Sequence, residues 1–345
     1  MVSHRRSSQP GPVTRTGVTV ASAAALATAA AALSGAPASA DPAAGREAAT
    51  ARVDRLYEEA ERATEKFNGA SDLTRRLRDE VSNLQDRTAR AQGRVNRMRT
   101  RLGALAAAQY RTGGLDPTVR LLLSERPDSY LEKASALDRL HTVQAAELRE
   151  LRGAQRFLEQ QRRATTAKLA DLVAGRRDVA RHKKAVQHRL AAAQRLLNEL
   201  PRDARAAYDR VSRSDGRDGA FPDLSGVVPA SGRAAAAVAA VRAAVGSPYA
   251  WGSTGPAAFD CSGLTQWAYE RAGVSIPRTS QAQRGAGRQV PLSQAQPGDL
   301  VVYRSDASHV GLYVGNGQVV HAPYPGARVR YDPVGMMPIA SVTRP

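Results

Sequence analysis

The chain has 345 residues, enough for more than one domain, and its composition changes along its length. Aromatic residues make up only 5% of the chain, and most of them lie in its last third, which predicts a compact C-terminal domain behind an elongated, aromatic-poor part. The formal net charge of +18 indicates an anionic partner, but we find no zinc-finger spacing and no aromatic platform and therefore expect no nucleic-acid partner.

The N-terminus carries the three-part pattern of an export signal. Basic residues come first, an uncharged, alanine-rich stretch follows over residues 16–33, and Ala38 and Ala40 then stand in a small-x-small arrangement. This order predicts a secretory signal peptide over residues 1–40. A retained membrane anchor is the alternative, but the alanine-rich run and the cleavage pattern favour removal. We therefore expect the mature protein to be secreted.

Apolar residues recur at steps of three and four over a long stretch that begins at Val53. The steps continue to Leu105, and Arg, Glu, Asp and Gln fill the intervening positions, as in a coiled-coil seam with solvated flanks. A glycine pair then stops the series, and a second, less regular one reaches about Tyr208. Two long helices joined by a short turn predict an antiparallel coiled-coil hairpin over residues 41–212. The predicted seams include Val53, Ala60, Ala63, Phe67, Leu77, Val81, Ala91 and Val95 in the first helix, and Leu148, Leu158, Leu169, Leu172, Val186 and Leu197 in the second.

Residues 213–232 are rich in Gly, Asp, Pro and Ser and have few apolar residues at a regular spacing. That composition is typical of a linker. We therefore expect the last domain to occupy residues 233–345, where both tryptophans of the chain are found.

The chain has a single cysteine, Cys261. A helix is predicted to begin at it, because Asp260 is a good N-cap and Leu264, Trp267 and Ala268 share one helical face. Backbone N–H groups and the positive end of the helix dipole favour a thiolate there, which lowers the pKa of a thiol, and the same groups can hold an oxyanion. This placement favours a nucleophile, although a lone cysteine is more often a small buried hydrophobe.

Three short strands are predicted between residues 298 and 321, and Asn316-Gly317 is expected to form the turn between the last two. His309 opens one strand of this hairpin and His321 closes the other, so the hairpin can bring both imidazoles to one edge. A thiolate needs a base, and the base needs a third group that orients it. These are the only histidines after the linker, but a histidine at a strand end also has a common structural role, so the residues alone leave both readings open.

Five short motifs follow one another in the last domain. They are Pro248-Tyr249-x-Trp251-Gly252, Phe259-Asp260-Cys261-Ser262-Gly263-Leu264, Pro277-Arg278-Thr279-Ser280-x-x-Gln283, Pro297-Gly298-Asp299-Leu300 and Ser308-His309-Val310-Gly311-Leu312-Tyr313. In order and spacing they resemble the NlpC/P60 family of cell-wall cysteine peptidases, over roughly residues 233–345. One departure is Ser253-Thr254, which replaces a second glycine often found after Trp-Gly in the family.

The resemblance implies a papain-like α+β domain, preceded here by the all-α hairpin. It implies cleavage of peptidoglycan stem peptides, commonly between D-glutamate and a diamino acid such as diaminopimelate, with neither a metal nor an organic cofactor. The catalytic residues that it implies are Cys261 as nucleophile, His309 as base and then acid, and His321 as the polar third member.

Four further residues are implied in substrate binding. Tyr249 would help to hold the oxyanion, and Asp260 and Ser262 would line the substrate subsite. Arg278 would shape the groove. For Asp260 a plain helix cap is an equal alternative, and for Arg278 a structural role is the stronger one.

A helical hairpin before such a domain also resembles secreted cell-separation hydrolases, in which the helical arm is thought to restrain the enzyme or to dock on a membrane-bound division complex. The partners expected are therefore stem peptides, anionic cell-wall polymers and such a complex, and the expected location is extracellular or at the cell wall. We expect the arm to lower activity by covering the groove. The alternatives are an amidase or acyltransferase on the same frame, and a wall-binding scaffold without catalysis.

Overall fold

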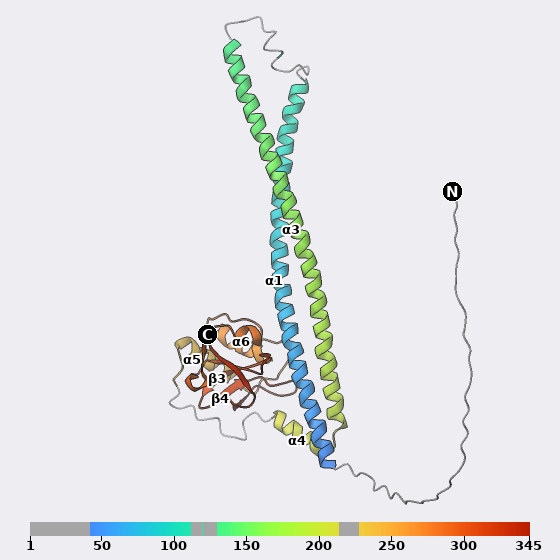
Figure 1. Cartoon of the computed structure of the whole chain (residues 1–345), viewed down its shortest axis with the longest axis vertical. Helices are drawn as coiled ribbons and strands as arrows, with labels where there is room; N and C mark the ends of the chain where they lie inside the picture. Colours follow the sequence, from blue (N-terminus) through green and yellow to red (C-terminus); the bar gives the residue numbers. More distant parts are fainter. Residues whose placement is uncertain (1–41, 112–118, 120–129, 214–227) are drawn as a thin grey trace, which may run out of the picture. The chain divides into compact units, whose positions relative to one another are not determined.

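The computed structural model describes residues 42–111, 119, 130–213 and 228–345 (Figure 1). The predicted signal peptide, the turn between the long helices and most of the predicted linker lie outside these residues. Among the described residues, none of the helices has an apolar stretch long enough to cross a membrane.

Two 70-residue helices form the N-terminal part, α1 (Pro42–Arg111) and α3 (Tyr130–Glu199). They run side by side in opposite directions (Figure 1). The pairs between them show this direction, because residues late in α1 contact residues early in α3 and the reverse. These pairs are Arg94–Glu150, Thr88–Thr165, Glu80–Lys168 and Glu59–Arg189. The antiparallel hairpin predicted from the sequence is therefore confirmed.

The predicted seam is buried along most of α1 but only in parts of α3. Val53, Val81 and Val95 of α1 are buried, as are Leu158 and Val186 of α3. The prediction is wrong for Leu148 and Leu169, which are 45% and 39% exposed. The apolar series of α3 is interrupted by charged residues, so the helix has no continuous apolar face to place against its partner.

The second long helix also ends earlier than predicted. A single helix to about Tyr208 is expected from the apolar series, but α3 ends at Glu199 and a separate helix, α4 (Arg202–Arg213), follows. Pro201 explains the break, because proline lacks the N–H that a helix interior needs and disfavours helical backbone in the residue before it.

The C-terminal part is an α+β domain. Its helices are α5 (Gly232–Ala243), α6 (Cys261–Arg271) and the short α7 (Ser280–Gln283), with a 3-10 turn, η2, at Leu292–Gln294. Its strands are β1 (Arg288–Val290), β2 (Leu300–Tyr303), β3 (His309–Gly315), β4 (Gln318–His321), β5 (Arg330–Pro333) and β6 (Ile339–Arg344). Within this domain the strands form one antiparallel sheet in the order β1-β6-β2-β3-β4-β5.

The hairpin of β3 and β4 follows the sequence prediction. Gly315 pairs with Gln318, and Asn316 and Gly317 between them have φ angles of 50° and 68°. Both residues of a type I′ turn need a positive φ, and asparagine and glycine are the residues that adopt it at least cost. This turn fixes which residues of β3 and β4 face one another, and so places His309 and His321.

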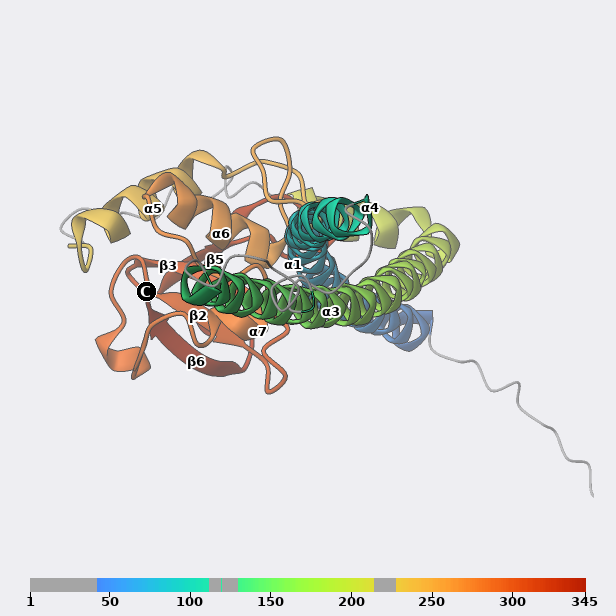
Figure 2. The ribbon, with the colours of Figure 1, turned by 90° about the horizontal axis from the view of Figure 1, so that it is seen from above.

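Helices α5 and α6 lie together on one face of the sheet (Figure 2). Leu264 and Ala268 of α6 pack with Val241 of α5 and with Leu312 of β3 in one buried cluster. This cluster is built from residues of the C-terminal domain alone, and so is the cluster on the other face, around Val301. The domain therefore closes its own core and holds α6 rigidly against the β3–β4 hairpin.

Candidate active site

Cys261 is the first residue of α6, as the sequence predicts. The N-cap is Asp260, whose Oδ1 accepts a hydrogen bond of 2.7 Å from the Gly263 N–H. Gly263 leaves no room for a side chain, because a Cβ there would stand 2.2 Å from the Ser253 carbonyl oxygen. The capped helix end and the tight loop beside it fix the position of the Cys261 thiol.

Asp260 does more than cap the helix. Arg278 forms an ion pair with it, donating from Nη2 to Oδ2 at 2.6 Å and from Nη1 to Oδ1 at 3.1 Å. The Gly252 N–H also donates to Oδ2, at 2.9 Å. Arg278 donates a further bond of 2.9 Å to Ser262 Oγ. The predicted subsite residues Asp260, Ser262 and Arg278 are thus brought together in one buried network beside the thiol.

His309 and His321 meet across the β3–β4 hairpin, with His309 Nε2 at 2.8 Å from His321 Nδ1. Gly311 makes room for this contact, because a Cβ there would stand 3.3 Å from the Cβ of His321. His321 Nε2 lies 2.8 Å from Asp332 Oδ2, and Arg330 donates to the same oxygen. Burial lowers the pKa of His321 to about 4, although its bond to Asp332 acts in the opposite direction. His321 is therefore neutral at physiological pH.

Tyr249 is 7% exposed, and among the described residues its hydroxyl has no hydrogen-bond partner. Burial raises the pKa of Tyr249, and the nearby charges of Cys261, Asp260 and two glutamates raise it further. The hydroxyl is therefore a neutral donor beside the thiol, with its hydrogen bond unused.

Helix α1 contributes a second buried face, which is polar and lies against the C-terminal domain. Glu61, Glu65 and Asn68, spaced as one helical stripe, are only 2–3% exposed. Glu61 Oε1 bonds to His309 Nδ1, and Arg304 donates to Glu61 Oε2 at 2.6 Å. The stripe therefore reaches into the site where the proposed base lies.

Glu65 and Asn68 occupy the neighbouring polar network. Glu65 Oε1 accepts from Ser262 Oγ at 2.6 Å, and Glu65 Oε2 accepts from the Ser280 N–H at 2.7 Å. Asn68 donates to Asp260 Oδ2 at 3.1 Å. Beyond them, Phe67 packs edge-on against Trp251 with ring centroids 5.1 Å apart. Phe67, predicted as a seam residue, thus faces the C-terminal domain.

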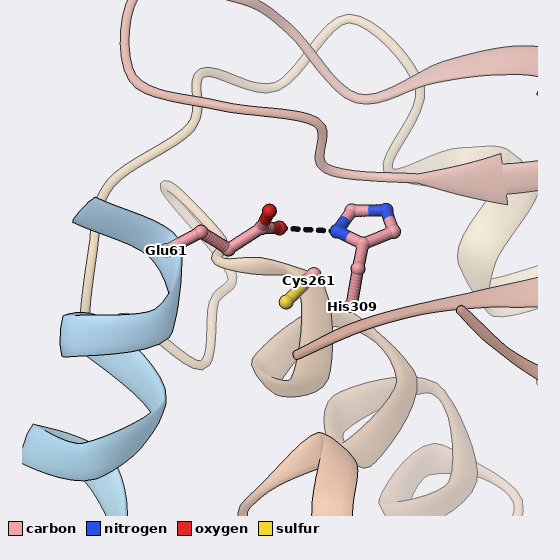
Figure 3. Close-up of side chains that lie close together, drawn as sticks. All are labelled: Glu61, Cys261 and His309. Atoms are coloured by element: carbon pink, nitrogen blue, oxygen red, sulfur yellow. Dashed lines mark hydrogen bonds and ion pairs between the residues drawn. The ribbon is translucent and has the colours of Figure 1, made fainter. Parts of the chain in front are cut away.

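Figure 3 shows Glu61 and His309 turned toward each other with Cys261 close beside them, each from a separate element. Their ligand atoms all lie within 4.8 Å of one another, and all three side chains are buried. These residue types also occur in zinc sites. In the structure, Glu61 Oε1 and His309 Nδ1 bond directly to each other.

The sequence predicts a lowered pKa for the Cys261 thiol, and with the arm in place this prediction is wrong. Burial raises the pKa of Cys261 well above its ordinary value, and the charges of Glu65, Glu61 and Asp260 raise it further. Only the backbone bond at Ser262 lowers it. The backbone N–H at the start of the helix lowers the thiol pKa as expected, but it is outweighed by desolvation and by two carboxylates of α1 that sequence reasoning does not place here.

Sequence reasoning missed these two carboxylates and Asp332. The spacing of Glu61, Glu65 and Asn68 is a recognisable stripe, but solvated helices carry the same spacing. Asp332 stands two residues from Arg330 in a short strand that the sequence pattern does not reveal. Its role follows only from the pairing of β5 with β4, which places it opposite Val319.

Residues 246–341 match the model of the NlpC/P60 family. A probable endopeptidase of Corynebacterium glutamicum is 50% identical over 116 residues, which are 34% of this chain and 56% of that protein. Probable endopeptidase p60 of Listeria monocytogenes is 48% identical over 97 residues, which are 28% of this chain and 20% of that protein.

The solved NlpC/p60 domain of the peptidoglycan hydrolase SagA is 36% identical, and the match covers 32% of this chain and 98% of that domain, with a TM-score of 0.31. The matched part of the chain spans little more than half the length of the corynebacterial relative. The likeness is thus one of the C-terminal domain, and the family match contains Cys261, His309 and His321. Residues 246–341 form an NlpC/P60 domain, carried in this chain behind a hairpin of two long helices.

Proposed function

We propose that this protein is a secreted peptidoglycan hydrolase, a cysteine endopeptidase that cuts stem peptides between D-glutamate and a diamino acid such as diaminopimelate. The observation that carries the proposal is the meeting of Cys261, at the N-terminus of α6, with His309 and His321 of the β3–β4 hairpin. The names of the relatives support an endopeptidase. The export signal pattern of residues 1–40 supports action at the cell wall.

The chemistry follows from the proton positions in the site. His321 donates from Nε2 to Asp332, so its Nδ1 is free of a proton and accepts from His309 Nε2–H. In the neutral imidazole this leaves His309 Nδ1 as the basic nitrogen on the side of Cys261. His309 takes the thiol proton there and is then an imidazolium beside the Cys261 thiolate. The thiolate attacks the peptide carbonyl, and His309 gives its proton to the leaving amine when the tetrahedral intermediate collapses. Water then hydrolyses the acyl-enzyme, with His309 again acting as base.

The oxyanion of the intermediate needs donors that are already in place. The backbone N–H groups at the start of α6 are one source, and the unpaired hydroxyl of Tyr249 is a second. Asp260, Ser262 and Arg278 line the neighbouring subsite for the stem peptide. Asp260 also caps α6 and pairs with Arg278, so the subsite is held in shape by the same bonds that hold the helix.

The helical arm is proposed to regulate this site by covering it. Glu61, Glu65 and Asn68 fill the space next to Cys261 and take up hydrogen-bond groups that a substrate would need. Docking on a membrane-bound division complex and contact with anionic wall polymers remain proposals that rest on the resemblance and on the charge of +18.

Mass spectrometry of purified peptidoglycan fragments tests the hydrolase. Residues 233–345, whose core is closed without the arm, are incubated beside the same residues with Cys261→Ala. The expected products are new fragments cut between D-glutamate and the diamino acid, absent with the variant. Release of the whole stem from the glycan would indicate an amidase instead. Identical uncut fragments from both would favour the non-catalytic scaffold.

The same assay tests the covering arm. Residues 41–345 are compared with residues 233–345 at equal concentration, and the longer chain is expected to cut far more slowly. Equal rates would show that the arm does not restrain the enzyme.

A further inference from the structure

The two ring nitrogens of His309 both face partners, and the partners decide where the protons are. On one side, His321 is neutral and donates its single proton from Nε2 to the Asp332 carboxylate, so its bare Nδ1 accepts a proton donated by His309 Nε2. On the other side, His309 Nδ1 faces a carboxylate oxygen of Glu61.

Glu61 is an acceptor in this contact. Burial raises the pKa of Glu61, but the charges and hydrogen bonds of His309 and Arg304 outweigh burial and lower it below its ordinary value. An ionised carboxylate can only accept, so the proton of the bond lies on His309 Nδ1. With protons on both nitrogens, His309 is an imidazolium while α1 is in place.

Cys261 is a neutral thiol while the arm is docked. Three carboxylates, those of Glu61, Glu65 and Asp260, surround the buried sulfur and oppose a further negative charge there. The sulfur lies 3.8 Å from Glu65 Oε1, with the thiol donating. The site with its arm therefore contains a thiol, an imidazolium and the Glu61 carboxylate.

We propose that Glu61 inhibits the enzyme by taking the place of the Cys261 thiolate as the counterion of His309. The arm then acts on the protonation of the site as well as on access to it. When α1 leaves, the Glu61 carboxylate goes with it into solvent, His309 keeps its proton, and the Cys261 thiol loses one proton to water. The result is a thiolate–imidazolium pair, in which one negative charge has been exchanged for another. The inference rests on the proposed roles of Cys261 and His309.

The two forms exclude each other, because thiolate and Glu61 compete for one imidazolium. Such coupling is reciprocal, so whatever favours the thiolate disfavours the docked arm to the same extent. A purely covering arm would have no such link, because the protonation of His309 would then be independent of it.

The first test is nitrogen NMR of the histidine side chains in residues 41–345 near neutral pH. The expected result for the wild type is a His309 ring with both nitrogens protonated. In Glu61→Gln the amide can donate to Nδ1 and keep the size of the side chain, so His309 is expected to be neutral with its proton on Nε2. The matched control is Glu58→Gln, one turn earlier on α1. Glu58 pairs with Arg62 and Arg304, and within the described part of the chain it forms no ion pair with His309. A neutral His309 in the wild type would overturn the proposal even if no variant folds.

The second test is the rate at which iodoacetamide alkylates Cys261, the sole cysteine of the chain. Glu61→Gln is expected to raise the rate at least tenfold over both wild type and Glu58→Gln, because an amide cannot serve as the counterion of the imidazolium and the released thiolate–imidazolium form is then favoured. An unchanged rate in Glu61→Gln, with wild-type thermal stability, would show that covering alone inhibits the site. Neither test uses peptidoglycan, so a failure here is distinct from a failure of the proposed hydrolase.

Discussion

We expect the carboxyl of Glu65 to weaken the docking of the arm as the pH rises. The carboxyl of Glu61 acts in the opposite direction, because its pKa is lowered in the docked state. Burial raises the pKa of Glu65 from 4.5 to about 7, and the charge of Asp260 adds to the rise. Because the pKa is higher when the arm is docked than when it is released, the protonated form favours docking. The contribution of Glu65 is fully present below pH 4.5 and is lost as the pH rises through about 7.

The size of the effect follows from the difference between the two pKa values. At about 1.4 kcal/mol per pKa unit, the rise from 4.5 to about 7 corresponds to about 3 kcal/mol in the docking equilibrium. Between about pH 5.5 and about pH 8, this difference in pKa weakens the docking equilibrium roughly 30-fold. Glu61, whose pKa is lowered, stays ionised over that range and contributes no change of its own.

The Ser280 amide is a direct reporter for this equilibrium. It is the first residue of α7 and donates its N–H to Glu65 Oε2, so its protection from hydrogen exchange depends on the docked arm. In residues 41–345 the protection of this amide, corrected for intrinsic exchange, should fall by roughly 30-fold more in the wild type than in Glu65→Gln over the same pH range. The proton that Cys261 loses on release of the arm is common to both proteins and cancels in the comparison.

Glu80→Gln is the matched control, because Glu80 lies on the same helix but pairs with Lys168 of α3. It should follow the wild type. The reasoning would be refuted if Glu65→Gln lost protection with pH as steeply as the wild type. It would also be refuted if this variant docked more weakly than the wild type at about pH 8, where removing the charge beside Asp260 should strengthen docking.

Three further predictions concern the domain itself and are best measured in residues 233–345. Asp332→Ala removes the acceptor that orients His321 and should lower kcat up to about 100-fold with little change in KM, and a changed KM with unchanged kcat would contradict this role. Tyr249→Phe should lower kcat roughly 100-fold if the hydroxyl holds the oxyanion, and the thermal midpoint should stay unchanged because no described residue bonds to that hydroxyl. Full activity would exclude the role. Leu264→Ala should lower the free energy of unfolding, measured with denaturant, by about 2–5 kcal/mol, because the side chain is fully buried between α6 and the sheet. A loss under about 1 kcal/mol would show that the core can collapse around the gap.

Local signals were enough to predict the parts of the site that depend on near neighbours. Asp260 before Cys261 defines a helix start, and the cap bond to the Gly263 N–H follows from it. Asn316-Gly317 defines a tight turn, which aligns the strands that carry the two histidines. The three strands β2, β3 and β4 were predicted for the same reason, since each is buried and bounded by turn residues.

The remaining strands carry weaker signals. β6 lies inside the sheet between β1 and β2, yet much of it is only half-buried and its residues do not alternate clearly. β5 is short and partly exposed, and it is a strand because β4 offers it hydrogen bonds. Asp332 could be recognised as the partner of His321 only after that pairing was known.

An NlpC/P60 domain with Cys261 and two histidines, behind two antiparallel helices, was thus predictable from the sequence, because caps, turns and apolar spacing act over a few residues. The burial of Glu61 and Glu65 in the site, rather than in solvent on the arm, became clear from the three-dimensional contacts alone. The helical period places both residues on one face but cannot tell what that face meets. That contact joins residues more than 190 positions apart, and it reverses the expected effect on the Cys261 thiol, because burial beside carboxylates outweighs the helix dipole.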